Sequence, residues 1–378
     1  MDQFSEIRPY LDQEVEGVLE KLIGNPEVLR ALMGLRYPKY LSRIPFIKSL
    51  VKYRLKSQSK SIKTVDEYQG VFKILMDGMI QETISNFSVS GVSDLDPGSS
   101  YLFISNHRDI ALDAALLNVS LYESKHKTFN MAVGNNLMQE KWASDLMRLN
   151  KSFIIQRSGT KKEIYTGLSL ASKFIQHTIF ESNESVWIAQ KQGRAKNGID
   201  KTDPAVLKMI HLTERKTQPI NKYFNSLKIV PVSISYEFDP NDCLKAIELS
   251  ATEDHQHYQK EKNEDLNSIA NGIKGQKGNV FINVAKPLNF SNEDDYEDTA
   301  DQITKSIISM YKLQPTNYAA AEMLGIASEI TPDFSNQEIQ HAKELLEQRM
   351  IKLDAGARSK FLEQYANPVV QKHRLNQT

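Results

Sequence analysis

"YLFISNHRDIALDAALL", residues 101–117, joins a short apolar run to a polar turn and then to a segment with helical spacing. The first five residues predict a buried strand, and a helix is expected to begin between Asp109 and Asp113. His107 follows the end of that strand. In open α/β sheets, ligands bind in the crevice at the carboxyl ends of the strands, so this junction is a candidate site.

Short apolar runs and helix-length segments alternate outward from this stretch. Five further buried strands are predicted at 129–133, 152–156, 185–189, 229–237 and 279–285. Amphipathic segments such as 136–150 and 161–180 lie between most of them. This alternation requires crossover connections, and it predicts an α/β fold with a mainly parallel sheet covered by helices on both faces.

The composition changes along the chain and suggests three regions. Residues 1–90 are rich in Leu, Glu, Lys and Gln with helical spacing and predict a helical N-terminal region. The α/β domain is expected at 91–290. Residues 291–378 are predicted as a helical C-terminal region, with breaks at Pro315 and Pro332.

Bulk properties exclude several functional classes. Lys+Arg and Asp+Glu both number 47, so the net charge gives no reason to expect a nucleic-acid partner. The single cysteine, Cys243, excludes an internal disulfide and a cysteine-based metal cluster, and it suits a reducing compartment. The acidic N-terminus is not a signal peptide, and no apolar run approaches the ~18–20 residues that span a bilayer. The expectation is an intracellular protein, soluble or surface-associated, that uses no metal and no cofactor.

The tripeptide His107-Arg108-Asp109 spells the H-R-D of a protein-kinase catalytic loop. A kinase needs a metal-binding Asn five residues after that Asp, but Ala114 stands there. No G-x-G-x-x-G precedes the loop, so the kinase interpretation fails.

Two carboxylates are close enough in sequence to orient His107. Either Asp109 or Asp113 accepting the Nδ1 proton would leave Nε2 free as a general base. The alternative is structural: His107 caps the helix and Asp113 interacts with its N-terminal dipole. Two later strand ends carry basic residues, Arg157 after one and the loop 191–196 after another. Arginines and glycines at the ends of neighbouring parallel strands form an anion cradle, which favours the functional interpretation.

Four blocks in order resemble the glycerolipid acyltransferases that acylate glycerol phosphate or lysophosphatidic acid. They are "NHRDIALD" at 106–113, "SFIIQRSG" at 152–159, "WIAQKQGRAKNG" at 187–198 and "IVPVSISYE" at 229–237. The resemblance implies that His107 is the general base and that Arg157 and Arg194 bind the acceptor phosphate. It also implies that Gly193 lets the loop approach the phosphate, and it places Lys191 and Gln192 among the substrate-binding residues.

Two positions depart from the pattern of this family. The family spaces its acid as H-x-x-x-x-D, whereas Asp113 lies one residue further on, so a bulge or a shifted helix start must absorb a residue. Asp113 is favoured over Asp109, because "LDAALL" matches the start of the family's helix better. Gln192 stands where the family carries Glu and keeps hydrogen bonds without the charge.

By this resemblance the reaction is direct acyl transfer. A glycerol hydroxyl, deprotonated by His107, attacks the thioester of acyl-CoA or acyl carrier protein. The acceptor is glycerol phosphate or a lysophospholipid, with 1-acyl-sn-glycerol-3-phosphate as the first choice. A non-catalytic lipid-binding or scaffold protein that retains the fold is the alternative, and Gln192 is its best support.

A basic amphipathic segment offers a route to lipid. From Arg36 to Lys63 there are nine Lys or Arg residues and no Asp or Glu, with Ile44, Ile47, Val51 and Leu55 at helical spacing. This pattern fits either an anionic membrane surface or a core helix with a solvated basic side. The first interpretation predicts a peripheral or monotopic protein on the cytoplasmic face of the membrane.

Overall fold

The computed structural model describes residues 2–36, 45–138, 140–253, 258, 263–326 and 332–377, with side chains for all of these except 35, 36 and 45–47. The chain divides into two compact units. The first unit comprises Met1–Gly78 and Phe129–Val186, and the second comprises Met79–Thr128 and Trp187–Thr378. Each unit is therefore assembled from separate stretches of sequence.

The first unit is mainly helical. Its parallel strand pair is β3 (Asn130–Gly134) with β4 (Ser152–Ile155), in which Met131 lies opposite Ser152. Its helices are α1 (Asp12–Gly24), α2 (Pro26–Arg36), α3 (Pro45–Ser59), most of α4 (Val65–Thr83), α6 (Lys141–Leu149) and α7 (Lys161–Phe180), with a 3₁₀ turn, η3 (Asn135–Leu137). A core cluster joins apolar residues of several of these helices: Val15, Val18, Leu19, Leu22, Val28, Ile62, Val65 and Leu149.

The second unit contains strands in the order β1-β7-β6-β2-β5. Their bounds are β1 (Ile84–Ser90), β2 (Leu102–Ser105), β5 (Val186–Ala189), β6 (Ile229–Tyr236) and β7 (Gly278–Val284). β1 pairs with β7 and β2 pairs with β6 in parallel, while β6 and β7 are antiparallel. Every residue of β2, β5 and β6 is buried, as expected for central strands whose residues are covered on both faces.

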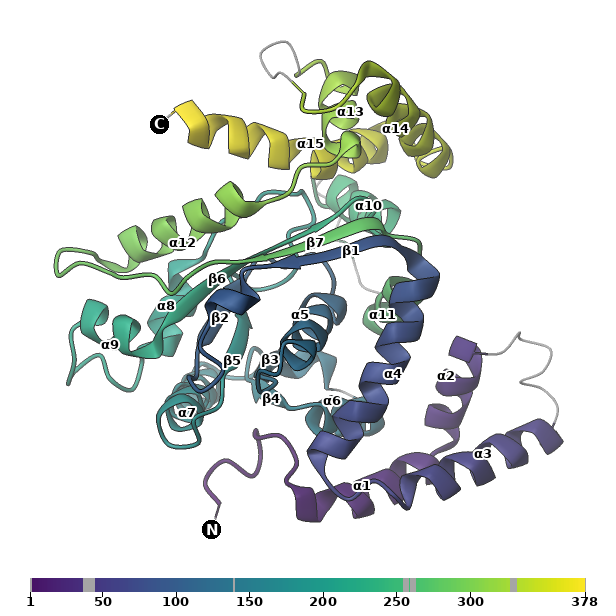
Figure 1. The fold of residues 1–378 in the computed structure, drawn as a ribbon, viewed down its shortest axis with the longest axis vertical. Coiled ribbons are helices and arrows are strands. Elements are labelled where there is room, and N and C mark those ends of the chain that lie inside the picture. The colour runs from purple at the N-terminus through teal and green to yellow at the C-terminus, as the bar shows by residue number, and fades with distance from the viewer. Residues whose placement is uncertain are drawn as a thin grey trace. The chain divides into compact units, whose positions relative to one another are not determined.

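The remaining helices also belong to the second unit. They are η2 (Val92–Asp94), α5 (Leu112–Glu123), α8 (Pro204–Ile210), α9 (Ile220–Leu227), α10 (Asp242–Glu253), α11 (Glu264–Lys274), α12 (Tyr296–Met310), α13 (Pro315–Met323), α14 (Asn336–Arg349) and α15 (Ala355–Gln377). A second core cluster lies within α10, α13, α14, α15 and the segments next to them, with Phe361 and Leu346 fully buried. In Figure 1 the yellow-green C-terminal helices gather around α15.

The predicted α/β class with mainly parallel strands is confirmed, and all six predicted strands are present within about one residue of their expected bounds. One correction concerns residues 1–90, which end in strand β1 rather than in helix. The sequence of β1, ISNFSVS, is mostly polar because the strand is at the edge of the sheet and largely exposed. It therefore lacks the apolar run that marks the other strands. The three predicted regions do not coincide with the two units and stay a prediction.

Candidate active site

Asn106 fixes the end of β2 to its neighbour β6. Its amide accepts a hydrogen bond from the Ile234 N–H at 2.8 Å and donates to the Ile234 carbonyl at 3.0 Å. Asn106 is fully buried, so these bonds replace those that water would supply. The chain then leaves the strand at His107, at the carboxyl edge where the sequence predicts the site.

His107 and Asp113 form a hydrogen-bonded pair. The imidazole Nδ1 lies 2.8 Å from Asp113 Oδ2, and the two side chains are 14% and 0% exposed. The same oxygen accepts the Arg108 N–H at 2.6 Å and the Asp109 N–H at 3.0 Å, while Oδ1 accepts the Tyr236 hydroxyl at 2.9 Å. Hydrogen bonds from these groups therefore satisfy both buried oxygens of the Asp113 side chain. If Nδ1 carries the proton that Asp113 accepts, Nε2 is the nitrogen left to act as a base.

Asp109 has a different function, which is to cap the turn before α5. Its Oδ1 accepts the N–H groups of Ala111 at 3.0 Å and Leu112 at 2.9 Å, and the helix begins at Leu112. The extra residue between His107 and its acid is therefore taken up by the turn at 108–111. Burial, followed by the nearby Asp113 charge, raises the pKa of Asp109. Of the two candidate acids, the structure brings Asp113 to the imidazole.

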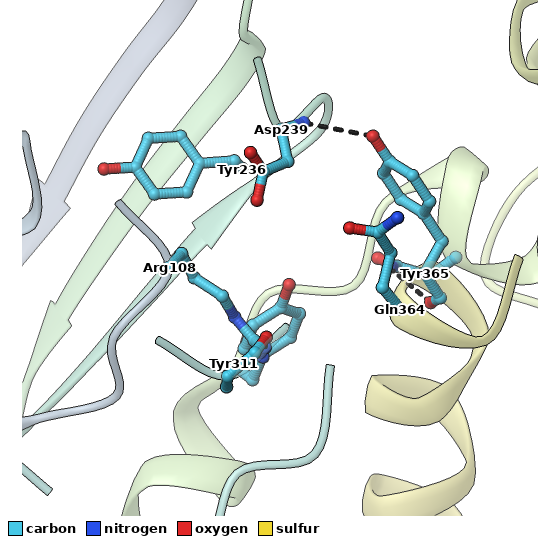
Figure 2. Close-up of a pocket in the computed structure, with 8 residues that line it drawn as sticks. Arg108, Tyr236, Asp239, Tyr311, Gln364 and Tyr365 are labelled. Atoms are coloured by element: carbon cyan, nitrogen blue, oxygen red, sulfur yellow. Dashed lines mark hydrogen bonds between the residues drawn. The ribbon is translucent and has the colours of Figure 1, made fainter. Parts of the chain in front are cut away.

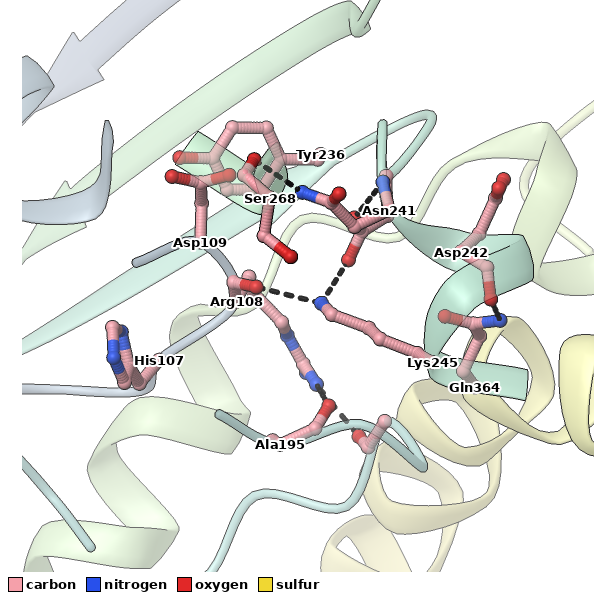
Figure 3. A network of polar contacts seen from close by, with 12 residues as sticks. His107, Arg108, Asp109, Ala195, Tyr236, Asn241, Asp242, Lys245, Ser268 and Gln364 are labelled. Carbon is pink, nitrogen blue, oxygen red and sulfur yellow. Dashed lines mark hydrogen bonds and ion pairs between the residues drawn. The ribbon is translucent and has the colours of Figure 1, made fainter. Parts of the chain in front are cut away.

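Arg108 joins this turn to the loop that follows β5. Its guanidinium pairs with Asp200 at 2.6 Å and donates to the carbonyls of Ala195 at 3.3 Å and Gly198 at 3.2 Å. The Ala195 N–H in turn donates to the His107 carbonyl at 2.7 Å. Figure 3 shows the His107 ring pointing away from the polar contacts around Arg108. The sequence analysis did not predict the ion pair between Arg108 and Asp200. Nothing in the sequence around Arg108 indicates a partner 92 positions away.

The predicted substrate-binding residues of this loop have distinct surroundings. Lys191 Nζ donates to the Ile199 carbonyl at 3.1 Å, and burial lowers its pKa although Asp200 opposes that shift. Gln192 and Gly193 are exposed. Gly193 has a φ of +77° and nothing within 4 Å of a Cβ placed there, so backbone conformation rather than space requires the glycine. Arg194 is half-buried, and within the described part of the chain its Nη1 is buried without a hydrogen-bond partner.

Arg157 belongs to the first unit, two residues after β4. Its N–H donates to Asn135 Oδ1 at 3.0 Å, and its side chain covers Gly134, where a Cβ would come within 2.8 Å of Cδ and Nε. Burial lowers the pKa of the guanidinium. Burial is the cause of this shift, and no charged neighbour among the described residues contributes to it.

Comparisons with known proteins match this chain to a family model and to solved structures. Residues 86–235 match the family model described as Acyltransferase, a range that includes His107, Asp113, Arg157 and Arg194. No curated protein matches the chain. The crystal structure of the 1-acyl-sn-glycerophosphate (LPA) acyltransferase PlsC from Thermotoga maritima is similar over 66% of this chain and 80% of that chain, with 12% identity and a TM-score of 0.36. The matched range contains the first three of the four blocks and most of the fourth, so the resemblance holds over residues 86–235, which are similar to the acyltransferase family.

Proposed function

We propose that this protein transfers a fatty acyl group from acyl-CoA or acyl carrier protein to a hydroxyl of a glycerol-phosphate-type acceptor, 1-acyl-sn-glycerol-3-phosphate first. The observation that carries the proposal is the His107–Asp113 pair within the residues that are similar to the acyltransferase family. The test is acyl transfer by the purified protein from radiolabelled acyl-CoA, and separately from radiolabelled acyl carrier protein thioester, to glycerol phosphate and a panel of lysophospholipids. Turnover requires both donor and acceptor, and its complete absence with every pair would reject the proposal.

The geometry supports a general-base mechanism. His107 Nε2 takes the proton of the acceptor hydroxyl while the hydroxyl oxygen attacks the thioester carbon. Asp113, bonded to Nδ1, stabilises the imidazolium, which then returns the proton to the departing thiolate. The new ester bond forms as the carbon–sulfur bond breaks, so the acyl group passes directly to the acceptor.

Cys243 is not suited to a covalent acyl-enzyme. Burial, and then the Asp242 charge, raises the pKa of its thiol to about 12. Because the thiolate is the nucleophile, a thiol that stays protonated at neutral pH is a poor one. Direct transfer is therefore the mechanism we propose.

Arg157→Ala and Arg194→Ala should each raise the acceptor KM, because each is proposed to bind the acceptor phosphate. Loss of one charge-assisted contact corresponds to about 10- to 100-fold in affinity. Steady-state kinetics with the acceptor and the donor varied separately measure this. Arg215→Ala, an exposed arginine of the second unit, is the matched control and should leave both constants unchanged. A rise in the donor KM alone would show that these arginines serve the donor.

A non-catalytic lipid-binding protein is the alternative function. Gln192 favours it, since an exposed neutral amide stands where the family carries a carboxylate. Gln192→Glu distinguishes the two: turnover by the wild type supports the enzyme, whereas turnover that appears only in the variant supports the scaffold.

We also propose that the protein works as a peripheral protein on an anionic, cytoplasmic membrane face. No helix in the described residues is long and apolar enough to cross a membrane. Of the predicted apolar stripe, Ile44 lies outside the described residues, while Val51 and Leu55 are half-buried on α3, which packs against α1. Leu50 and Tyr53 remain 46% and 72% exposed beside Lys52. Exposed apolar groups among lysines support surface binding.

Replacing Lys48, Lys52 and Lys56 with Glu should release the protein from anionic vesicles. Each basic residue near an anionic surface contributes about 1 kcal/mol, and salt screens the attraction within a Debye length. Vesicle flotation at low and high salt measures the effect. The matched control reverses three exposed lysines elsewhere: Lys216, Lys222 and Lys352. Flotation that neither salt nor the first triple variant changes would make α3 an ordinary solvated helix.

A further inference from the structure

Helix α15 holds the loop that carries Arg194 through two amide side chains. Gln371 Nε2 donates to the Asp200 carbonyl at 2.8 Å, and the Asp200 N–H donates to Gln371 Oε1 at 2.7 Å. Asn367 Nδ2 donates to the Asn197 carbonyl at 2.7 Å. The two residues are four apart, so both project from one face of the helix. They satisfy backbone groups of a loop that has no regular secondary structure of its own.

The approach of α15 to this loop is close. Gly198 has a φ of +77°, and a Cβ placed there would lie 2.2 Å from the Gln364 carbonyl oxygen of α15. Figure 2 shows Gln364 and Tyr365 of α15 facing Arg108 and Tyr311 across a small cavity. The cavity has a volume of about 30 Å³, which is room for water but not for an acyl chain. Helix and loop therefore pack directly, and this cavity is not the acyl site.

Arg108 holds the same loop at other groups. Its guanidinium donates to the carbonyls of Ala195 and Gly198 and pairs with the Asp200 carboxylate, while Gln371 bonds the Asp200 backbone. The loop is thus fixed between α15 and the turn that begins at His107. Arg194 lies next to Ala195, whose N–H bonds the His107 carbonyl, so any shift of the loop moves Arg194 relative to the imidazole.

We propose that Gln371 and Asn367 are positioning residues for the acceptor, acting through the 191–200 loop. Helix α15 then positions the acceptor site by holding the loop that carries Arg194. This inference rests on the proposed function, since it takes Arg194 as a phosphate ligand. Independently of turnover, we expect the 191–200 loop to lose its hydrogen bonds to α15 and to open more often when the two amides are removed.

The test compares Gln371→Met with the wild type. Methionine keeps the length and packing of glutamine but forms neither hydrogen bond to Asp200. Hydrogen exchange of the peptide spanning 191–200 should accelerate about tenfold, and the acceptor KM should rise about tenfold with the donor KM unchanged. Gln377→Met, whose amide contacts only His373 of the same helix in the described structure, is the matched control and should change neither.

A second variant, Asn367→Ala, allows the same measurement if the Gln371→Met protein does not fold. It removes the separate bond to Asn197 and should accelerate exchange in the same peptide. Unchanged exchange in both folded variants would overturn the inference whatever the activity is. Faster exchange with an unchanged acceptor KM in an active enzyme would overturn it too. Failure of the proposed function is distinct, because it would appear as no turnover by the wild type.

Discussion

Replacing His107 with alanine is expected to abolish acyl transfer and leave the fold intact. General acid–base catalysis contributes about 10²–10⁴-fold to the rate, so kcat should fall by at least about 10²-fold. The fold should survive because Asp113 keeps its bonds from the Arg108 and Asp109 N–H groups and from Tyr236. The measurement is turnover with acyl-CoA and lysophosphatidic acid, together with circular dichroism and thermal unfolding.

His341→Ala is the matched control, since His341 is exposed on α14 and far along the chain from the site. It should retain wild-type turnover. A folded His107→Ala protein with near wild-type turnover would end the assignment of His107 as the base.

Asp113→Asn should lower turnover by about 10²–10⁴-fold, and Asp109→Asn should have a much smaller effect. Asparagine at 113 is nearly isosteric, but it removes the charge that stabilises the imidazolium and offers a donor where Oδ2 now accepts three hydrogen bonds. At 109, the asparagine oxygen can still accept the two N–H groups that cap the turn.

The comparison of kcat for these two isosteric variants at one pH measures the difference. Each is the control of the other, because both remove one buried carboxylate from residues 109–113. Equal losses would mean that the combined charge of the two carboxylates, rather than the bond to Nδ1, supports the base.

The elements of this fold that could be predicted from the sequence are those that local residue patterns determine. The strands β2, β5 and β6 are buried along their whole length, so each reads as an apolar run between polar segments. Strand β1 is exposed at the sheet edge and has no such run. Asp113 could be favoured over Asp109 as the partner of His107 because the segment LDAALL resembles the start of the family's helix. The start of a helix is also determined by nearby residues.

The contacts that could not be predicted connect residues far apart in the chain. Gln371 and Asp200 are separated by 171 positions, and a glutamine on a C-terminal helix looks like any solvated polar residue. The partner of Arg108 was missed for the same reason, since Asp200 lies 92 positions away. Such pairs depend on packing that the local pattern does not encode.

The turn capped by Asp109 has a consequence for recognising this histidine–acid pair in a sequence. A search that demands a fixed count of residues between histidine and acid would reject this chain, although the acid reaches the imidazole. The turn at 108–111 accommodates the additional residue, because Asp109 accepts the N–H groups of Ala111 and Leu112 where α5 begins. The pair depends on the direction in which the acid points, and a turn of this length is compatible with that direction because the Asp109 side chain accepts the N–H groups at its end.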